Sequence, residues 1–129
     1  MFNRVEVNNN SVHGIFVNGA VSTGKINATV AESVAANNGS SGFNVASSSG
    51  QAATSLMVVR SVAANNGAGI SANSTASNAT VRLSQSTVTG NNSGFQVIGG
   101  GGAVLSYSDN NIDGNGAGTE TPTGALTKK

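Results

Sequence analysis

Two aspartates, Asp109 and Asp113, are the residues of this sequence whose type and spacing come nearest to a catalytic arrangement. Two carboxylates at this spacing, placed across a strand and a turn, could flank a glycosidic bond or hold a cation. No third ligand or further catalytic base accompanies them, so the pattern favours two exposed carboxylates in a turn. We therefore predict no catalytic residue and no metal ligand, and we keep both aspartates as weak ligand candidates.

Glu32 and Arg60 are a second pair of residues that could bind a ligand. They occupy equivalent positions in two copies of a repeat, residues 30–39 and 58–67, which differ at only two of ten positions. The simpler interpretation is a stacked ion pair of opposite charge on neighbouring coils, which contributes little if it is exposed. The alternative is a charged patch with Arg82 nearby that binds a uronic acid or another glycan. Both residues therefore remain weak ligand candidates.

The other reactive residue types are scarce. His13 is the only histidine and has no serine or carboxylate at an equivalent position, so we interpret it as a solvated turn residue. Tyr107 is the only tyrosine and there is no tryptophan, so an aromatic platform for a sugar ring is poorly supplied. The absence of cysteine excludes a disulfide framework, a thiolate nucleophile and a zinc knuckle. No cofactor is predicted.

Composition and charge narrow the class of protein further. The 129 residues suffice for one domain, and six basic against five acidic residues leave no basic stripe that would bind nucleic acid. No apolar run is long enough to predict membrane insertion. A chain of low charge with 18 glycines and regularly spaced Val and Ile indicates a repetitive β architecture.

The sequence contains five copies of one unit. An aliphatic residue recurs at Val7, Val34, Val62, Val88 and Ile112. Three positions after each of these comes an asparagine: Asn10, Asn37, Asn65, Asn91 and Asn115. A glycine follows at Gly14, Gly42, Gly69, Gly94 and Gly118, with spacings of 28, 27, 25 and 24 residues.

The unit is typical of a corner between two strands. Apolar residues behind the glycine alternate with period two and no window keeps a helical period, so stacked strands are predicted. We expect Val62, Ile70 and Ala72 to point inward. The asparagines are expected to turn the backbone and to hydrogen-bond from coil to coil as a ladder. The glycines are needed either for a positive φ or for a close approach to the next coil, and the sequence does not separate these.

This pattern resembles the right-handed parallel β-helix repeat proteins of pectate-lyase-like architecture, over roughly residues 2 to 121. The fold class is accordingly all-β: a right-handed parallel β-helix, or solenoid, of about five coils of 24–28 residues with an Asn ladder. Residues 1–121 are predicted to form the β-helix, and residues 122–129 a C-terminal tail or short cap. The resemblance also implies a bacterial or phage protein.

These observations favour a non-catalytic structural or binding module, associated with a surface or with a glycan. The alternative is a fragment or remnant of a carbohydrate-active β-helix enzyme, a polysaccharide lyase or hydrolase. The partners expected are a polysaccharide or glycan, and a second copy through end-to-end association of uncapped coils. A secreted or cell-surface location fits this class, although the sequence shows no signal peptide.

Overall fold

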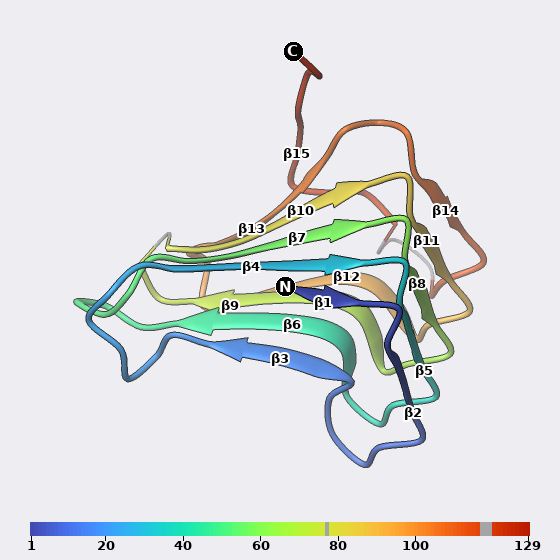
Figure 1. Cartoon of the computed structure of the whole chain (residues 1–129), viewed down its shortest axis with the longest axis horizontal. Coiled ribbons are helices and arrows are strands. Elements are labelled where there is room, and N and C mark those ends of the chain that lie inside the picture. Colours follow the sequence, from blue (N-terminus) through green and yellow to red (C-terminus); the bar gives the residue numbers. More distant parts are fainter. Residues whose placement is uncertain (77, 117–119) are drawn as a thin grey trace.

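A computed structural model describes residues 1–76, 78–116 and 120–129 of the chain. Every regular element in these residues is a β-strand, and each strand runs parallel to its neighbours in a sheet (Figure 1). Four coils contribute a strand to all three sheets and a fifth contributes only to two, so the solenoid has about four turns. The predicted all-β parallel solenoid is confirmed, with about four turns instead of about five.

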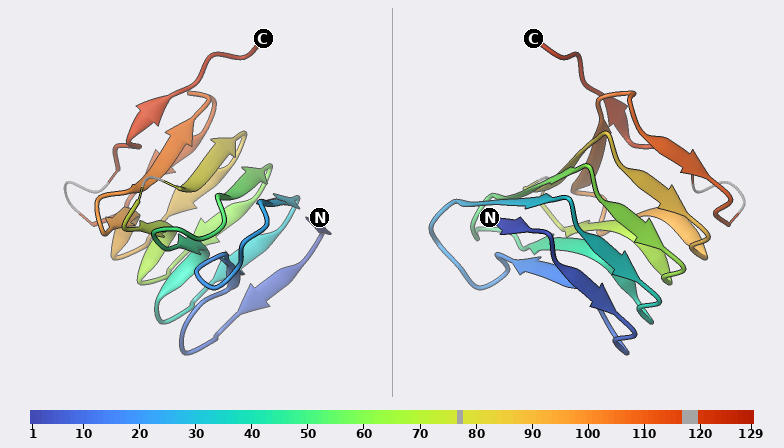
Figure 2. Two further views of the ribbon diagram at one scale, coloured as in Figure 1. Left: turned by 90° about the vertical axis from the view of Figure 1, so that its left-hand side faces the viewer. Right: turned by 45° about the vertical axis from the view of Figure 1, so that its right-hand side comes forward.

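Three sheets form the sides of the solenoid, and we call them A, B and C. Sheet A has the order β1 (Phe2–Asn3), β4 (Ile26–Ala31), β7 (Thr54–Val59), β10 (Ala79–Ser84), β13 (Gly102–Ser106) and β15 (Gly124–Ala125). Sheet B has the order β14 (Asn111–Asp113), β11 (Thr87–Thr89), β8 (Val62–Ala64), β5 (Val34–Ala36) and β2 (Glu6–Asn8). Sheet C has the order β12 (Ser93–Ile98), β9 (Ala68–Ser74), β6 (Ser41–Ser47) and β3 (Ile15–Asn18). Figure 2 shows the coils stacked along one axis, with the two termini toward opposite ends.

The core is a continuous column of side chains between the sheets. Alternate residues of a strand point to opposite faces, so the residues in register on neighbouring coils pile into rows. Phe43, Ile70, Leu56 and Leu83 are the largest fully buried side chains. Ile70 and Ala72 are both fully buried, which confirms their predicted inward direction.

The inward row of sheet B differs by one residue from the predicted row. It runs Val7, Ala35, Ala63, Val88 and Ile112 through the strand register. Val34 and Val62 are half-buried and precede these inward alanines, so the prediction for Val62 was wrong. Strands β5 and β8 have three residues each, and only the middle residue, Ala35 or Ala63, is buried.

The asparagine ladder is present, but two of its five members differ from the prediction. Side-chain amides hydrogen-bond from coil to coil through Asn10, Asn38, Asn66, Asn91 and Asn115. Asn10, Asn91 and Asn115 therefore have the expected place, whereas Asn37 and Asn65 do not. Asn38 and Asn66 are buried, and each Oδ1 accepts from both the backbone N and the Nδ2 of the preceding ladder residue.

Asn37 and Asn65 have the other role that was expected of the asparagine, the sharp turn. Both are exposed and both have φ of 55°. The residues at the same place in the next two coils are Gly90 and Gly114, with φ of 65° and 71°. Asn and Gly are the residue types that adopt this left-handed conformation most easily. The turn and the ladder thus use consecutive residues, and the pairs Gly90–Asn91 and Gly114–Asn115 in the sequence reveal the correct alignment.

A second ladder, which the sequence analysis missed, joins sheets A and B. The serines are Ser33, Ser61 and Ser86, and Asn110 continues their column. Each serine Oγ accepts a backbone N–H from the coil before it and donates to the carbonyl two residues earlier in its own coil. The identical Ser33 and Ser61 in the two most similar copies were the available signal. These bonds satisfy buried polar groups at a corner that turns within a few residues.

The glycine column serves close approach and not positive φ. Gly14, Gly42 and Gly69 have ordinary φ values. A Cβ on Gly69 would lie 2.5 Å from Val88 Cγ1, 2.9 Å from Asn91 Nδ2 and 2.9 Å from the Gly94 carbonyl oxygen. The backbone therefore packs directly on the ladder. The fifth predicted member, Gly118, lies outside the described residues.

We expect Gly69→Ala to lower the free energy of unfolding by about 1–3 kcal/mol, because a methyl group must displace the backbone and the ladder amide that it meets. Gly24→Ala is the matched control, since a Cβ there meets no atom within 4 Å. Urea denaturation followed by circular dichroism measures both. Equal stability of the two variants would contradict the close-approach role.

No helix in the described residues is long and apolar enough to span a membrane.

Candidate ligand-binding site

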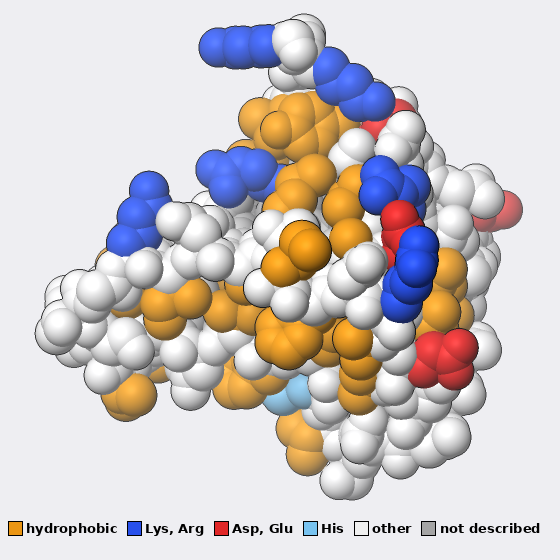
Figure 3. All heavy atoms as spheres, viewed as in Figure 1, with side chains coloured by type: hydrophobic (Ala, Val, Ile, Leu, Met, Phe, Trp, Pro, Cys, Tyr) orange, Lys and Arg blue, Asp and Glu red, His pale blue; other side chains and the backbone are white. Residues whose placement is uncertain are grey.

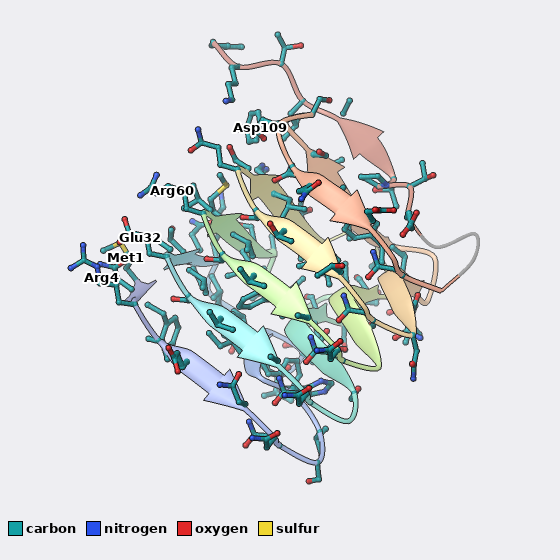
Figure 4. All side chains as sticks on the ribbon, turned by 90° about the vertical axis from the view of Figure 1, so that its right-hand side faces the viewer. Met1, Arg4, Glu32, Arg60 and Asp109 are labelled. Carbon is teal, nitrogen blue, oxygen red and sulfur yellow. The ribbon has the colours of Figure 1, made fainter. Side chains whose placement is uncertain are left out.

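Glu32 and Arg60 lie on the corner between sheets A and B, and Arg4 joins them there. Figure 4 shows the three side chains in a column along this corner. Glu32 Oε2 lies 2.9 Å from Arg4 Nε, and Glu32 Oε1 lies 3.1 Å from Arg60 Nη2. The hydrogen bonds from Arg4 and then from Arg60 lower the pKa of the Glu32 carboxyl group. The predicted ion pair is therefore part of a group of three residues, in which the Glu32 carboxylate lies between two arginines.

Asp109 lies farther along the same corner, toward the C-terminal end (Figure 4). Its Oδ2 lies 2.7 Å from Lys128 Nζ and accepts a hydrogen bond of 2.8 Å from Ser84 Oγ. The hydrogen bond from Lys128, with smaller contributions from Ser84 and the backbone of Gln85, lowers the pKa of Asp109 to about 2. The carboxylate is thus charged at neutral pH and held by a residue of the C-terminal segment.

Asp113 is separate from these groups. It is exposed on β14, at one edge of sheet B, and Glu6 is exposed on β2 at the opposite edge. Four strand steps of about 4.8 Å separate the two strands. Within the described chain, no three His, Cys, Asp or Glu side chains gather where they could hold a metal ion.

His13 lies near the corner between sheets B and C, on the side of the first coil. Its Nε2 is 3.2 Å from Asn44 Nδ2, and its ring packs against Phe16 at 5.0 Å between centroids. Burial lowers the pKa of His13, so the imidazole is neutral at pH 7. This arrangement satisfies Asn44 on the outer face of sheet C.

A hollow lies on the outer face of sheet A, at the start of the strands. It has a volume of about 190 Å³. The residues that line it are Lys25, Asn27, Ala53, Thr54, Ser55, Asn78, Thr80 and Arg82. This volume is below the roughly 300–1,000 Å³ of pockets that enclose a drug-sized ligand. The hollow is therefore too small to enclose a drug-sized ligand.

The floor of this hollow is a row of small polar side chains. Asn27, Ser55 and Thr80 are in register on the neighbouring strands β4, β7 and β10, so their side chains follow one another at about 4.8 Å. Ser55 Oγ donates to Asn27 Oδ1 at 2.6 Å, which leaves the Asn27 amide nitrogen available to a ligand. The row thus offers both hydrogen-bond donors and hydrogen-bond acceptors on the outer face of sheet A.

Two cations border the hollow. Lys25 immediately precedes β4, and Arg82 lies two residues beyond Thr80 on β10. Neither side chain has an ion pair or hydrogen bond with any described residue, whereas Arg4, Arg60 and Lys128 are all paired with carboxylates. Figure 3 shows this face of the molecule, with basic side chains over sheet A and uncharged polar atoms between them. The hollow is therefore positively charged and open to an anion.

The sequence analysis had singled out Arg82 but not Lys25, Asn27, Ser55 or Thr80. These four residues come from three different coils, and the register partners Asn27, Ser55 and Thr80 are three different residue types. The only available signal was the register that the Asn and Gly columns impose. Counting back from the ladder residues Asn38, Asn66 and Asn91 gives the same distance to Asn27, Ser55 and Thr80, but the predicted columns do not.

Comparison with protein-family models, with curated proteins and with solved structures finds no match to this chain. The class that fold and site define is therefore a parallel β-solenoid with a buried Asn ladder and a cationic hollow on one sheet.

Proposed function

We propose that this protein is a binding module for an acidic polysaccharide, which lies across the strands on the outer face of sheet A. The observation that carries the proposal is the pair Lys25 and Arg82, two cations that border a polar row and have no ion pair with a described residue. A guanidinium group and an ammonium group are suitable donors for the carboxylate or sulfate groups of such a chain. The hydroxyl groups of the sugar would then bind Asn27, Ser55 and Thr80.

The geometry of the solenoid supports an extended ligand over a compact one. The polar row runs perpendicular to the strands, along the axis on which the coils are stacked. The hollow is open, so a polymer can continue past it in both directions. The resemblance implied that a glycan binds, and this proposal names the residues that would bind it. Lys25 and Arg82 replace the predicted candidates Glu32, Arg60, Asp109 and Asp113 as the proposed ligand contacts.

We expect Arg82→Gln to weaken binding of a polyuronate by about 10- to 150-fold, because a hydrogen bond to a charged group contributes about 1.5–3 kcal/mol. Lys25→Gln should have a smaller effect, and the double variant should show no measurable binding. Isothermal titration calorimetry with oligogalacturonates of defined length measures the affinities. Lys129→Gln is the matched control, since it removes the same charge away from the hollow.

The controls separate this proposal from its alternatives. An equal loss of binding in Lys129→Gln would indicate attraction by net charge, and a neutral glucan that binds as well as the polyuronate would exclude an anion site. Release of reducing or unsaturated sugar ends by the wild-type protein, abolished in Asp109→Asn, would instead favour the carbohydrate-active enzyme. We expect no such product.

A further inference from the structure

Four Asn–Gly pairs occur in the chain, and three of them begin at a ladder residue. The ladder pairs are Asn38–Gly39, Asn66–Gly67 and Asn115–Gly116, and the fourth pair, Asn18–Gly19, lies at the end of β3. Asparagine is a chemically labile residue, and it deamidates most readily before glycine, which has no side chain to hinder attack by its nitrogen. The ladder therefore contains the dipeptide in which this reaction is easiest.

The glycine of a ladder pair is imposed by the packing of the coils. A Cβ on Gly39 would lie 2.3 Å from Ser11 O, and a Cβ on Gly67 would lie 2.6 Å from Ser40 O. The backbone would have to move at both positions to admit any other residue. The ladder requires asparagine, and the close approach requires glycine directly after it. The labile dipeptide is thus a consequence of the architecture.

The folded chain holds both reacting groups of the two buried pairs. Deamidation requires the glycine N to lose its proton and to bond to the Cγ of the preceding side chain. Gly39 N donates to Asn10 O at 2.8 Å, and Gly67 N donates to Asn38 O at 3.1 Å. The side chains of Asn38 and Asn66 are buried, and each makes four hydrogen bonds. The nitrogen and the amide are therefore kept from reacting while the coils stay stacked.

We propose that Asn38 and Asn66 are latent deamidation sites, which react when the coils separate and then prevent the ladder from forming again. In the unfolded chain the glycine N bonds to Cγ and the Cγ–Nδ2 bond breaks. The Nδ2 group leaves as ammonia, with the proton that the glycine N has lost. Water then opens the five-membered imide and leaves either aspartate or isoaspartate.

Both products are incompatible with the ladder. An aspartate in place of Asn66 has no Nδ2, so Ala35 O and Asn91 Oδ1 lose their donor. Its negative charge would be buried beside the Asn91 oxygen without a cation. Isoaspartate adds one methylene group to the main chain, which disturbs the register between coils. Unfolding thus becomes irreversible in proportion to the time that the chain spends unfolded.

The test follows the sites in the full chain by peptide mass spectrometry, after incubation in mildly alkaline buffer with and without guanidinium chloride. We expect Asn38 and Asn66 to deamidate about a hundredfold or more slowly in the folded protein, because a buried ladder opens rarely. In the denaturant they should react several-fold faster than the ladder residues Asn10 and Asn91, which glycine does not follow. Equal rates at Asn66 in the folded and the unfolded protein would overturn the proposal.

Asn18 provides the internal control for refolding. Its side chain is exposed and outside the ladder, and its Oδ1 accepts from Ala20 N at 2.9 Å, as an aspartate oxygen also would. After the denaturant is removed, refolded chains should contain unmodified Asn38 and Asn66. Aspartate formed at Asn18 should occur in refolded and unrefolded chains alike. Deamidated Asn66 in equal amounts in the two fractions would contradict the proposal.

Two variants test the same consequence directly. Asn66→Asp should not reach the circular dichroism spectrum of the native protein, whereas Asn18→Asp should reach it. A native spectrum for Asn66→Asp would show that the ladder accepts the product, and the proposal would fail.

Discussion

The Asn66→Ala variant should lose about 3–5 kcal/mol of its free energy of unfolding, which is a large part of the roughly 5–15 kcal/mol of a typical domain. Asn66 is buried in the middle of the ladder and makes four side-chain hydrogen bonds. Its Oδ1 accepts twice from Asn38, and its Nδ2 donates to Ala35 O and Asn91 Oδ1. Alanine leaves these groups without partners in a site from which water is excluded.

The neighbouring residue provides the control. Asn65 is exposed, has φ of 55° and makes no side-chain hydrogen bond with a described residue. Asn65→Gly suits this backbone conformation, so its stability should stay within about 1 kcal/mol of the wild type. Equilibrium unfolding in urea, followed by far-ultraviolet circular dichroism, compares the two variants. A larger loss in Asn65→Gly than in Asn66→Ala would mean that the ladder follows the predicted alignment after all.

The Phe43→Ala variant should lose about 3–5 kcal/mol, the cost of removing a buried aromatic ring and leaving a cavity. Phe43 is fully buried on β6, and its register partners are Ile15 and Ile70. Two coils therefore lose a contact with one substitution. The stacked strands cannot close the gap, since their spacing is fixed by backbone hydrogen bonds.

Phe16→Ala is the matched control for Phe43→Ala. Phe16 lies on the next strand, β3, in register with Asn44, and its side chain points to the opposite face of sheet C with 45% of its surface exposed. We expect a change within about 1 kcal/mol. Thermal unfolding by differential scanning calorimetry gives both values. Similar losses in the two variants would indicate that β6 has the opposite face toward the core.

Predictions from the sequence held where a feature recurs on every coil. The period-two alternation predicted that Ile70 and Ala72 point inward, and the five asparagines predicted a ladder. The predicted ladder was displaced by one residue at Asn37 and Asn65. The true ladder residues, Asn38 and Asn66, are also asparagines, so either alignment fits the local pattern. In a strand of three residues there is too little alternation to separate Val62 from Ala63.

Features that depend on a single residue or on several coils were not predicted. Glu120 Oε1 accepts hydrogen bonds from Asn115 N and Nδ2. No other copy of the repeat has an equivalent glutamate, so this contact could not be read from the repeat. The hollow between Lys25 and Arg82 combines residues more than fifty positions apart. Their proximity follows from the coil length, which varies from copy to copy.

The sequence by itself determined the solenoid, since a repeated corner with alternating apolar residues can bury its side chains only by stacking on copies of itself. Only the tertiary structure decided which of two consecutive asparagines turns the chain and which joins the ladder. It also decided which cations are paired with carboxylates. Each of these depends on the register between coils, and a shift of one residue exchanges inward for outward side chains while the local pattern stays the same.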